Sequence, residues 1–216
     1  MPYTVDNQRF IAASALSNGD RRQVLQKVGA PTNNPVVLYA SKFQKRKHPD
    51  DLLKAIAALR DKGLECTLLM VGSGEMRREL EELVDALTLD NVCFAGFVNQ
   101  SELPRVYGAC DVFVLPSENE PWGLIVNEVM CAGLPIVISD EVGCVPDLVK
   151  HGDNGFLFKA GDVEGLARAL APLLADADLR KRMGQRSRER IEKWSYAECL
   201  AGIKVALQST ALTRDV

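Results

Sequence analysis

Short apolar runs alternate with longer stretches of mixed polar and apolar residues along most of the chain. The runs are rich in β-branched residues and apolar throughout, which is typical of strands covered on both faces of a parallel sheet. We expect six strands, over Val36–Ala40, Thr67–Val71, Val92–Phe97, Val112–Pro116, Ile136–Ser139 and Gly155–Phe158. The stretches between them have a helical period and predict helices over Asp50–Lys62, Glu75–Leu87, Ser101–Cys110, Gly123–Ala132 and Val145–His151.

Beyond residue 161 the pattern is helical only, over Asp162–Ala175, Asp178–Lys193 and Ser195–Gln208. Strands and helices that alternate at this length form right-handed βαβ units. The sequence therefore predicts an α/β fold, a doubly wound parallel sheet with a helical C-terminal extension.

Composition narrows the class of protein. The chain has 216 residues, 47% of them hydrophobic and 25% charged, as in ordinary globular proteins. Its net charge of −3 gives no general attraction for nucleic acid, and no apolar run reaches the roughly 20 residues that cross a bilayer. The first residues lack the features of a secretory signal, and the six cysteines form no C-x-x-C pair, so we expect reduced thiols in a cytoplasmic protein.

Doubly wound sheets bind ligands at the carboxyl ends of their strands, which directs attention to the loops that follow the strands. The loop after the first strand, Ser41–His48, holds four cations, Lys42, Lys45, Arg46 and Lys47. An isolated charge run is more often a solvated loop. The position of this run favours an anion pocket, because a helix N-terminus with free N–H groups is expected to follow and reinforce the lysines.

A second loop, Val71–Glu75, contains Gly72 and Gly74 between a strand and a helix. The pair is only part of the G-x-G-x-x-G fingerprint, since Arg77 stands at the third position. A tight turn that needs glycine explains it equally well, and it gives no support for a nicotinamide cofactor.

The third loop is the most informative, because it places Glu120 and Glu128 on either side of a helix that begins near Gly123. For each glutamate alone, a surface position is the simpler interpretation. Together they flank the free amides of one helix N-terminus, where an anion is stabilised. This pattern fits a nucleoside diphosphate sugar, with the sugar at Glu120, the diphosphate at the helix start and the ribose at Glu128.

The segment 120–128 is an E-x7-E motif, and with Ala132–Val137 it resembles the retaining glycosyltransferases of family four. Lys42 and Lys47 match the basic pair of that family, although its first position is often arginine, whose bidentate fork lysine lacks. The resemblance covers nearly residues 2–208, and its further matches are 91–98, 143–149, 154–158 and, for the interdomain connection, 5–10.

The resemblance implies the carboxy-terminal, Rossmann-like half of a GT-B enzyme, with the amino-terminal acceptor half outside the match. It implies hexosyl transfer with retained configuration from a nucleotide sugar to a glycan or lipid-linked acceptor, and little activity for this chain alone. By the same resemblance we expect the nucleotide base to face the Phe97–Val98 backbone and the two lysines to neutralise the diphosphate. Glu120 is expected to bind the sugar hydroxyls and Glu128 the ribose. The implied catalytic residues are Lys42, Lys47 and Glu120, and the implied donor-binding residues are Val98, Gly123, Leu124, Ile125, Glu128, Phe97 and Gly72.

The expected organisation has three parts. Residues 1–30 form the connection and a leading helix, 31–194 the nucleotide-sugar-binding domain, and 195–216 a terminal helix and tail. We expect the apolar stripe of that helix to pack partly on the amino-terminal acceptor half. Through that half we expect the whole enzyme to associate peripherally with the cytoplasmic face of a membrane. The stripe consists of Tyr196, Cys199, Leu200, Ile203 and Leu207.

We expect no cofactor and no metal. Asp176-Ala177-Asp178 matches the D-x-D pattern, but it joins two helices beyond the sheet, and Asp178 suits a helix cap. His48 and His151 are expected in loops, without ligand-like partners. Two other functions stay open: a non-catalytic nucleotide-sugar-binding module, and a nucleotide-sugar epimerase of the same architecture.

Overall fold

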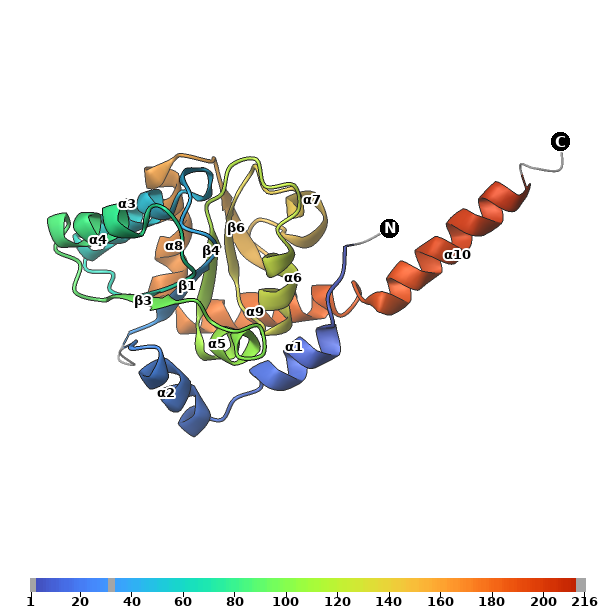
Figure 1. The fold of residues 1–216 in the computed structure, drawn as a ribbon, viewed down its shortest axis with the longest axis horizontal. Coiled ribbons are helices and arrows are strands. Elements are labelled where there is room, and N and C mark those ends of the chain that lie inside the picture. The colour runs from blue at the N-terminus through green and yellow to red at the C-terminus, as the bar shows by residue number, and fades with distance from the viewer. Residues whose placement is uncertain (1–2, 31–33, 213–216) are drawn as a thin grey trace.

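The computed structural model describes residues 3–30 and 34–212, so residues 1–2, 31–33 and 213–216 of the expected connection, domain start and tail lie outside the described residues. Six parallel strands form one sheet in the order β3-β2-β1-β4-β5-β6 (Figure 1). This order is that of a doubly wound sheet and confirms the predicted fold class. The strands are β1 (Val36–Ala40), β2 (Thr67–Val71), β3 (Val92–Gly96), β4 (Val112–Leu115), β5 (Ile136–Ser139) and β6 (Gly155–Phe158).

Four strands have the predicted bounds, and β3 and β4 each end one residue earlier than expected. Gly96 has a φ of 68°, a conformation that takes the chain out of the extended geometry before Phe97. The central strands β1, β2, β4 and β5 are buried along their whole length, as their unbroken apolar sequences predicted.

Helices cover both faces of the sheet. One face packs against α1, α2, α5, α6 and α7, and the other against α3, α4 and α8. The side chains of β1 alternate between the two cores, with Leu38 in the first and Tyr39 in the second. The helices of the described chain are α1 (Asn7–Ser14), α2 (Asn18–Lys27), η1 (Lys45–Lys47), α3 (Pro49–Arg60), α4 (Arg77–Ala86), α5 (Leu103–Ala109), α6 (Leu124–Cys131), α7 (Val145–Leu148), α8 (Val163–Ala175), α9 (Ala177–Ile191) and α10 (Tyr196–Leu212).

The structure corrects three details of the sequence reading. Residues 7–27 form two helices rather than one leading helix, and a capping box between Ser17 and Asp20 starts the second. A 3-10 turn, η1, lies inside the basic loop. The side chain of Asp176, not that of Asp178, caps α9, because it accepts from the amides of Asp178 and Leu179.

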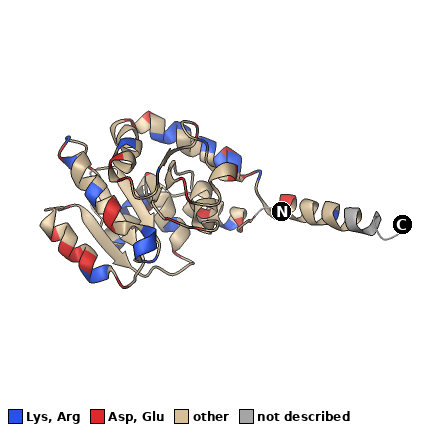
Figure 2. Ribbon diagram, turned by 90° about the horizontal axis from the view of Figure 1, so that it is seen from above, with Lys and Arg blue, Asp and Glu red and all other residues tan. Residues whose placement is uncertain are grey.

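Helix α10 projects away from the body of the domain (Figure 1), and Figure 2 shows it almost free of charged residues. The large apolar side chains of its first three turns are exposed, with Leu200 at 57% and Leu207 at 64%. Cys199, another member of the expected stripe, is half-buried. Among the described helices, none has the length and apolar character that crossing a membrane requires. All six cysteines are free thiols, four of them buried.

Candidate functional site

The site lies where the strand order reverses, between β1 and β4. These strands are parallel neighbours, so their carboxyl ends open at the same edge of the sheet. The two loops that follow them, the basic loop Ser41–His48 and the loop Ser117–Gly123, therefore meet, and the Glu118 amide donates to the Arg46 carbonyl at 2.9 Å. Ligands of doubly wound sheets bind at this topological switch point.

The glycines of the second loop allow it to approach the basic loop closely. The Ser41 amide donates to Val71, and the Phe43 amide to Ser73. Gly72 has a φ of 135°, and a Cβ atom at Gly72 would overlap the carbonyl oxygen of Ser41. Glycine is thus required at position 72 by its φ angle and by the close approach of two backbone segments, and Gly72 forms part of the wall of the site.

An open pocket of about 260 Å³ lies at this edge and is lined by segments from four regions of the chain. Half of the ten predicted site residues line it, namely Lys42, Gly72, Phe97, Val98 and Ile125. The Phe97 side chain is 82% exposed at its rim. Lys42 is exposed and has no ion-pair partner in the part of the chain that the structure describes.

Glu128 is connected to the pocket by a hydrogen bond from Tyr107, a residue that the sequence analysis missed. Tyr107 on α5 lines the pocket, and its hydroxyl donates to the Glu128 carboxylate at 2.8 Å. Burial raises the pKa of Glu128, an effect that the Tyr107 hydrogen bond opposes. Burial beside this carboxylate also raises the pKa of Tyr107, so the phenol stays protonated and acts as a donor. Tyr107 thus fixes the orientation of Glu128.

Glu120 and Lys47, both predicted site residues, are partners of each other. The Lys47 ammonium contacts the Glu120 carboxylate, and the guanidinium of Arg46 lies 3.9 Å from the same carboxylate. Both side chains of the pair are largely buried, with 9% of Lys47 and 15% of Glu120 exposed. Burial, and then repulsion from Arg46, lower the pKa of Lys47 to about 8.

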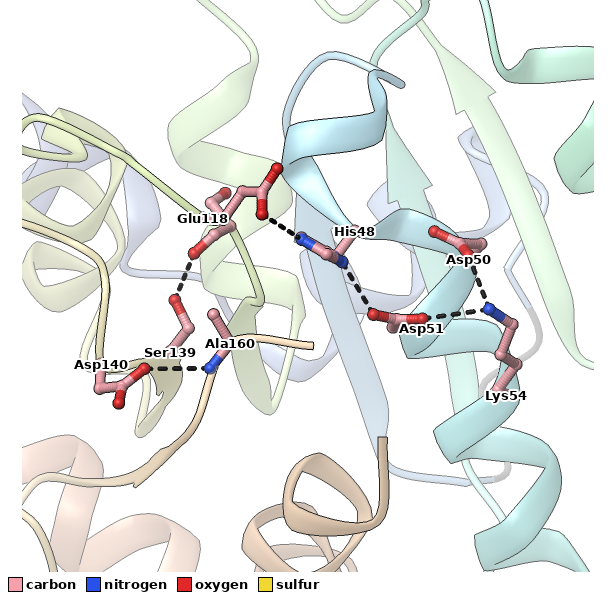
Figure 3. Close-up of polar contacts among 9 residues, drawn as sticks. His48, Asp50, Asp51, Lys54, Glu118, Ser139, Asp140 and Ala160 are labelled. Atoms are coloured by element: carbon pink, nitrogen blue, oxygen red, sulfur yellow. Dashed lines mark hydrogen bonds and ion pairs between the residues drawn. The ribbon is translucent and has the colours of Figure 1, made fainter. Parts of the chain in front are cut away.

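His48 joins the two loops a second time, as Figure 3 shows. Its Nδ1 lies 2.8 Å from the Asp51 carboxylate and its Nε2 3.4 Å from that of Glu118. The residue lies in a loop as predicted, between η1 and α3, in the left-handed region with a φ of 47°. Its two carboxylate neighbours were not foreseen.

Helix α3 does not reinforce the lysines as expected. Its first turn carries Asp50 and Asp51, so this helix end is occupied by negative charge from the chain itself. Lys54 binds both carboxylates, at 2.7 and 3.1 Å (Figure 3). The anion-binding character of this edge therefore comes from the basic loop and from α6.

The start of α6 has the open amides that the sequence predicted. Its first residues, Leu124 and Ile125, follow Gly123, which has a φ of 84° and provides no side-chain cap. The first turn contains no acidic residue, and Leu124 is 45% exposed. An anion at this point would meet the positive end of the helix dipole without competition from a capping side chain.

Within residues 3–30 and 34–212, no cluster of histidine, cysteine and carboxylate side chains has the arrangement of a metal site. This edge of the sheet thus combines a partly apolar pocket lined by Lys42 with the uncapped start of α6. The Lys47–Glu120 pair and Glu128 belong to the same loops and helix but do not line the pocket. Such a combination suits a molecule with an anionic centre, hydroxyl groups on both sides and a flat apolar end.

Comparison with known proteins agrees with this chemistry. Residues 20–190 match the family described as glycosyl transferases group 1. The chain is 32% identical over 208 residues to N-acetyl-alpha-D-glucosaminyl L-malate synthase of Bacillus anthracis, an alignment that covers 96% of this chain and 52% of the relative. The chain therefore spans about half the length of that curated relative. A second curated relative is sulfoquinovosyl transferase SQD2 of Arabidopsis thaliana, of which the alignment covers 34%.

Solved structures give the same result. Anabaena HepE in complex with UDP-glucose superimposes with a TM-score of 0.80 at 27% identity, over 92% of this chain and 55% of that one. The C-terminal domain of LpcC, a group 1 glycosyl transferase of Francisella tularensis, has this fold at 23% identity and a TM-score of 0.73, with 97% of its length covered. The family resemblance inferred from the motifs is thereby confirmed, together with the fold of a GT-B carboxy-terminal domain.

Proposed function

The chain belongs to the glycosyl transferases group 1 family, and from this membership we propose that it binds the nucleotide-sugar donor for a retaining hexosyltransferase. The complete enzyme would transfer the sugar to a glycan or a lipid-linked acceptor. The observation that carries the proposal is the pocket at the switch point, where Lys42, Gly72, Phe97, Val98 and Ile125 meet from separate parts of the sequence.

In this proposal the diphosphate lies between the basic loop and the start of α6. Lys42 and Lys47 and the amides of Leu124 and Ile125 surround it with positive charge. Negative charge grows on the diphosphate as the bond to the sugar breaks. Groups that are already in place stabilise that charge more in the transition state than in the ground state, which lowers the barrier.

The two glutamates bind the hydroxyl-bearing ends of the donor. Glu128, oriented by Tyr107, accepts from the ribose hydroxyls, while the backbone of Phe97 and Val98 faces the base. Glu120 accepts from the sugar, and its contact with Lys47 holds the carboxylate beside the diphosphate position. We assign Glu120 no role as a nucleophile.

We propose a uridine nucleotide as the donor, supported by the HepE relative, whose structures hold UDP and UDP-glucose. Isothermal titration calorimetry of the 216-residue chain with UDP tests this. Binding that weakens in Lys42→Ala and stays unchanged in Lys159→Ala, a lysine remote in sequence from the loops of the site, is the expected result. Absence of heat with UDP and with other nucleoside diphosphates contradicts the proposal.

Product analysis separates transfer from the other two functions. We expect the chain to bind UDP-glucose without turning it over, because the family members that it matches are about twice as long. An epimerase would release an isomerised nucleotide sugar, and a non-catalytic module would bind without any product even when the rest of the enzyme is supplied. Robust transfer by the purified chain alone contradicts the expected need for a second domain.

A further inference from the structure

Trp122, which lies between Glu120 and the start of α6, belongs to a polar and aromatic cluster that the proposed function does not use. Its indole N–H donates to the side-chain oxygen of Asn127 on α6 at 3.0 Å, and Asn127 donates to the Tyr3 carbonyl at 3.0 Å. Asn127 is fully buried. The loop of the site and the first turns of α6 are thus bonded to the N-terminal segment.

The segment that leads into α10 joins the same cluster. The indole of Trp194 stacks on that of Trp122 with ring centroids 6.4 Å apart and donates to the Tyr3 carbonyl at 3.0 Å. The Tyr3 ring lies 4.9 Å from the Trp122 ring. One carbonyl oxygen therefore accepts from both Asn127 and Trp194, and Trp122 packs against both segments.

Further bonds tie the two segments to each other. The hydroxyl of Thr4 donates to the Trp194 carbonyl at 3.1 Å, and the side chain of Asn7 donates to the Ile191 carbonyl at 2.9 Å. Figure 1 shows both segments leaving the body on the same side, close to α6. Any domain attached at either end would be joined to this one through the cluster.

We propose that Trp122 is a positioning residue that couples donor binding to the order of these two segments. The inference rests on the proposed function, because the coupling begins with an anion on the amides of Leu124 and Ile125. An anion there fixes the first turn of α6 and the loop before it, and so fixes Trp122 and Asn127. The hydrogen bonds and ring contacts of Trp122 and Asn127 then restrict the N-terminal segment and the segment that leads into α10. Donor binding and the order of these two segments are therefore linked by a coupling free energy.

Hydrogen exchange with UDP as the probe measures the coupling in the 216-residue chain. Three amides report it, because they are bonded within the segments: Asn7 to Val5, Phe10 to Asp6 and Cys199 to Ser195. We expect UDP at saturation to slow exchange in peptides 3–10 and 194–200 by about fivefold, the lower end of ordinary coupling strengths. Calorimetry on the same sample establishes that UDP is bound.

Two variants locate the coupling. Trp122→Phe keeps a ring but loses the bond to Asn127, and we expect it to bind UDP about fivefold more weakly, since coupling is reciprocal, and to lose the exchange response in both peptides. Trp194→Phe removes the indole bond to Tyr3, and we expect it to lose the response of 194–200 and to keep that of 3–10. By the same reciprocity its UDP affinity should lie between those of the wild type and Trp122→Phe. Tyr196→Phe, exposed on the next turn, is the matched control and keeps both responses.

The outcomes separate this inference from the proposed function. UDP binding by calorimetry with unchanged exchange in both peptides overturns the coupling and leaves the donor proposal in place. The same holds if Trp122→Phe, folded by circular dichroism, keeps the full exchange response. Absence of UDP binding overturns both proposals at once.

Discussion

Glu120 and Glu128, eight positions apart in the sequence, are held by different kinds of partner. Glu120 contacts the Lys47 cation and lies near a second cation, Arg46. Glu128 accepts from the neutral phenol of Tyr107 in a place where burial raises the pKa of its carboxyl group. The Glu120 end of the site is governed by charge, and the Glu128 end by a directional hydrogen bond.

The difference has a functional meaning under the proposed donor geometry. An ion pair beside the diphosphate adjusts when a second anion arrives, because the lysine then has two partners. A carboxylate oriented by a tyrosine stays in position and discriminates by geometry. The two ends should therefore respond differently to substitution, salt and pH, and four measurements test this.

Lys47→Ala carries the largest expected effect. It removes a largely buried cation next to the diphosphate position, and hydrogen bonds to charged groups are worth about 1.5–3 kcal/mol, so UDP affinity should fall about 10- to 100-fold by calorimetry. The fall should shrink in high salt. Lys45→Ala, an exposed lysine of the same turn, should keep wild-type affinity. Equal losses in the two variants would contradict a specific role for Lys47.

Glu120→Ala should separate the two ligands. UDP-glucose should bind about tenfold more weakly, because the sugar hydroxyls lose a charged acceptor. UDP has no sugar at this position and should bind no more weakly than to the wild type, measured by calorimetry at pH 6.5, where Lys47 stays charged. Glu118→Ala, two residues earlier in the loop, should leave both affinities unchanged. A loss of UDP affinity equal to that of UDP-glucose would break the assignment of Glu120 to the sugar.

Tyr107→Phe tests the neutral end. It leaves the ring in place and takes from Glu128 its hydrogen-bond donor, so both UDP and UDP-glucose should bind about fivefold more weakly, in keeping with a net value near 1 kcal/mol for such a bond. The loss should be the same at low and high salt, in contrast to that of Lys47→Ala. Tyr39→Phe, at a buried tyrosine of β1 whose hydroxyl donates to the Lys42 carbonyl, serves as a comparison for general effects on the core. A salt-dependent loss would show that this end is also governed by charge.

The pH dependence should be the smallest of the four effects. With a pKa of about 8, Lys47 is charged below that value and loses its proton above it, so raising the pH from 7.5 to 8.5 lowers the charged fraction about threefold. UDP affinity should fall by about the same factor, and the fall should be absent in Lys47→Ala. A flat profile in the wild type would contradict the prediction and place the pKa of Lys47 above this range already in the protein without UDP.

The strands were predictable because burial on both faces demands apolar side chains at successive positions, a pattern that Val36–Ala40 and Thr67–Val71 show directly. The start of α2 also has a local signal, because Ser17 and Asp20 have the spacing of a capping box. Residue spacing also placed the free amides of α6 correctly, because Gly123 supplies no cap.

The partners within the site were not predictable in the same way. Lys47 and Glu120 are 73 positions apart, and only the neighbouring position of β1 and β4 brings their loops together. Tyr107 was expected on a helix, but the period of that helix does not tell which element its hydroxyl meets. Such contacts depend on the strand order, which local patterns do not encode.

The same strand order has a consequence for how the protein reaches its native state. Strand β1 pairs with β2 and with β4, and its register with β4 joins Val37 to Val112, far apart along the chain. Pairings of such long sequence separation close large loops and form slowly. The basic loop follows β1 and the loop Ser117–Gly123 follows β4, so the pairing of these two strands brings the two halves of the site together. A chain that has folded only as far as β3 therefore has only the first half. Recovery of nucleotide binding after dilution from denaturant should therefore lag behind the return of helical signal and report the last step of assembly.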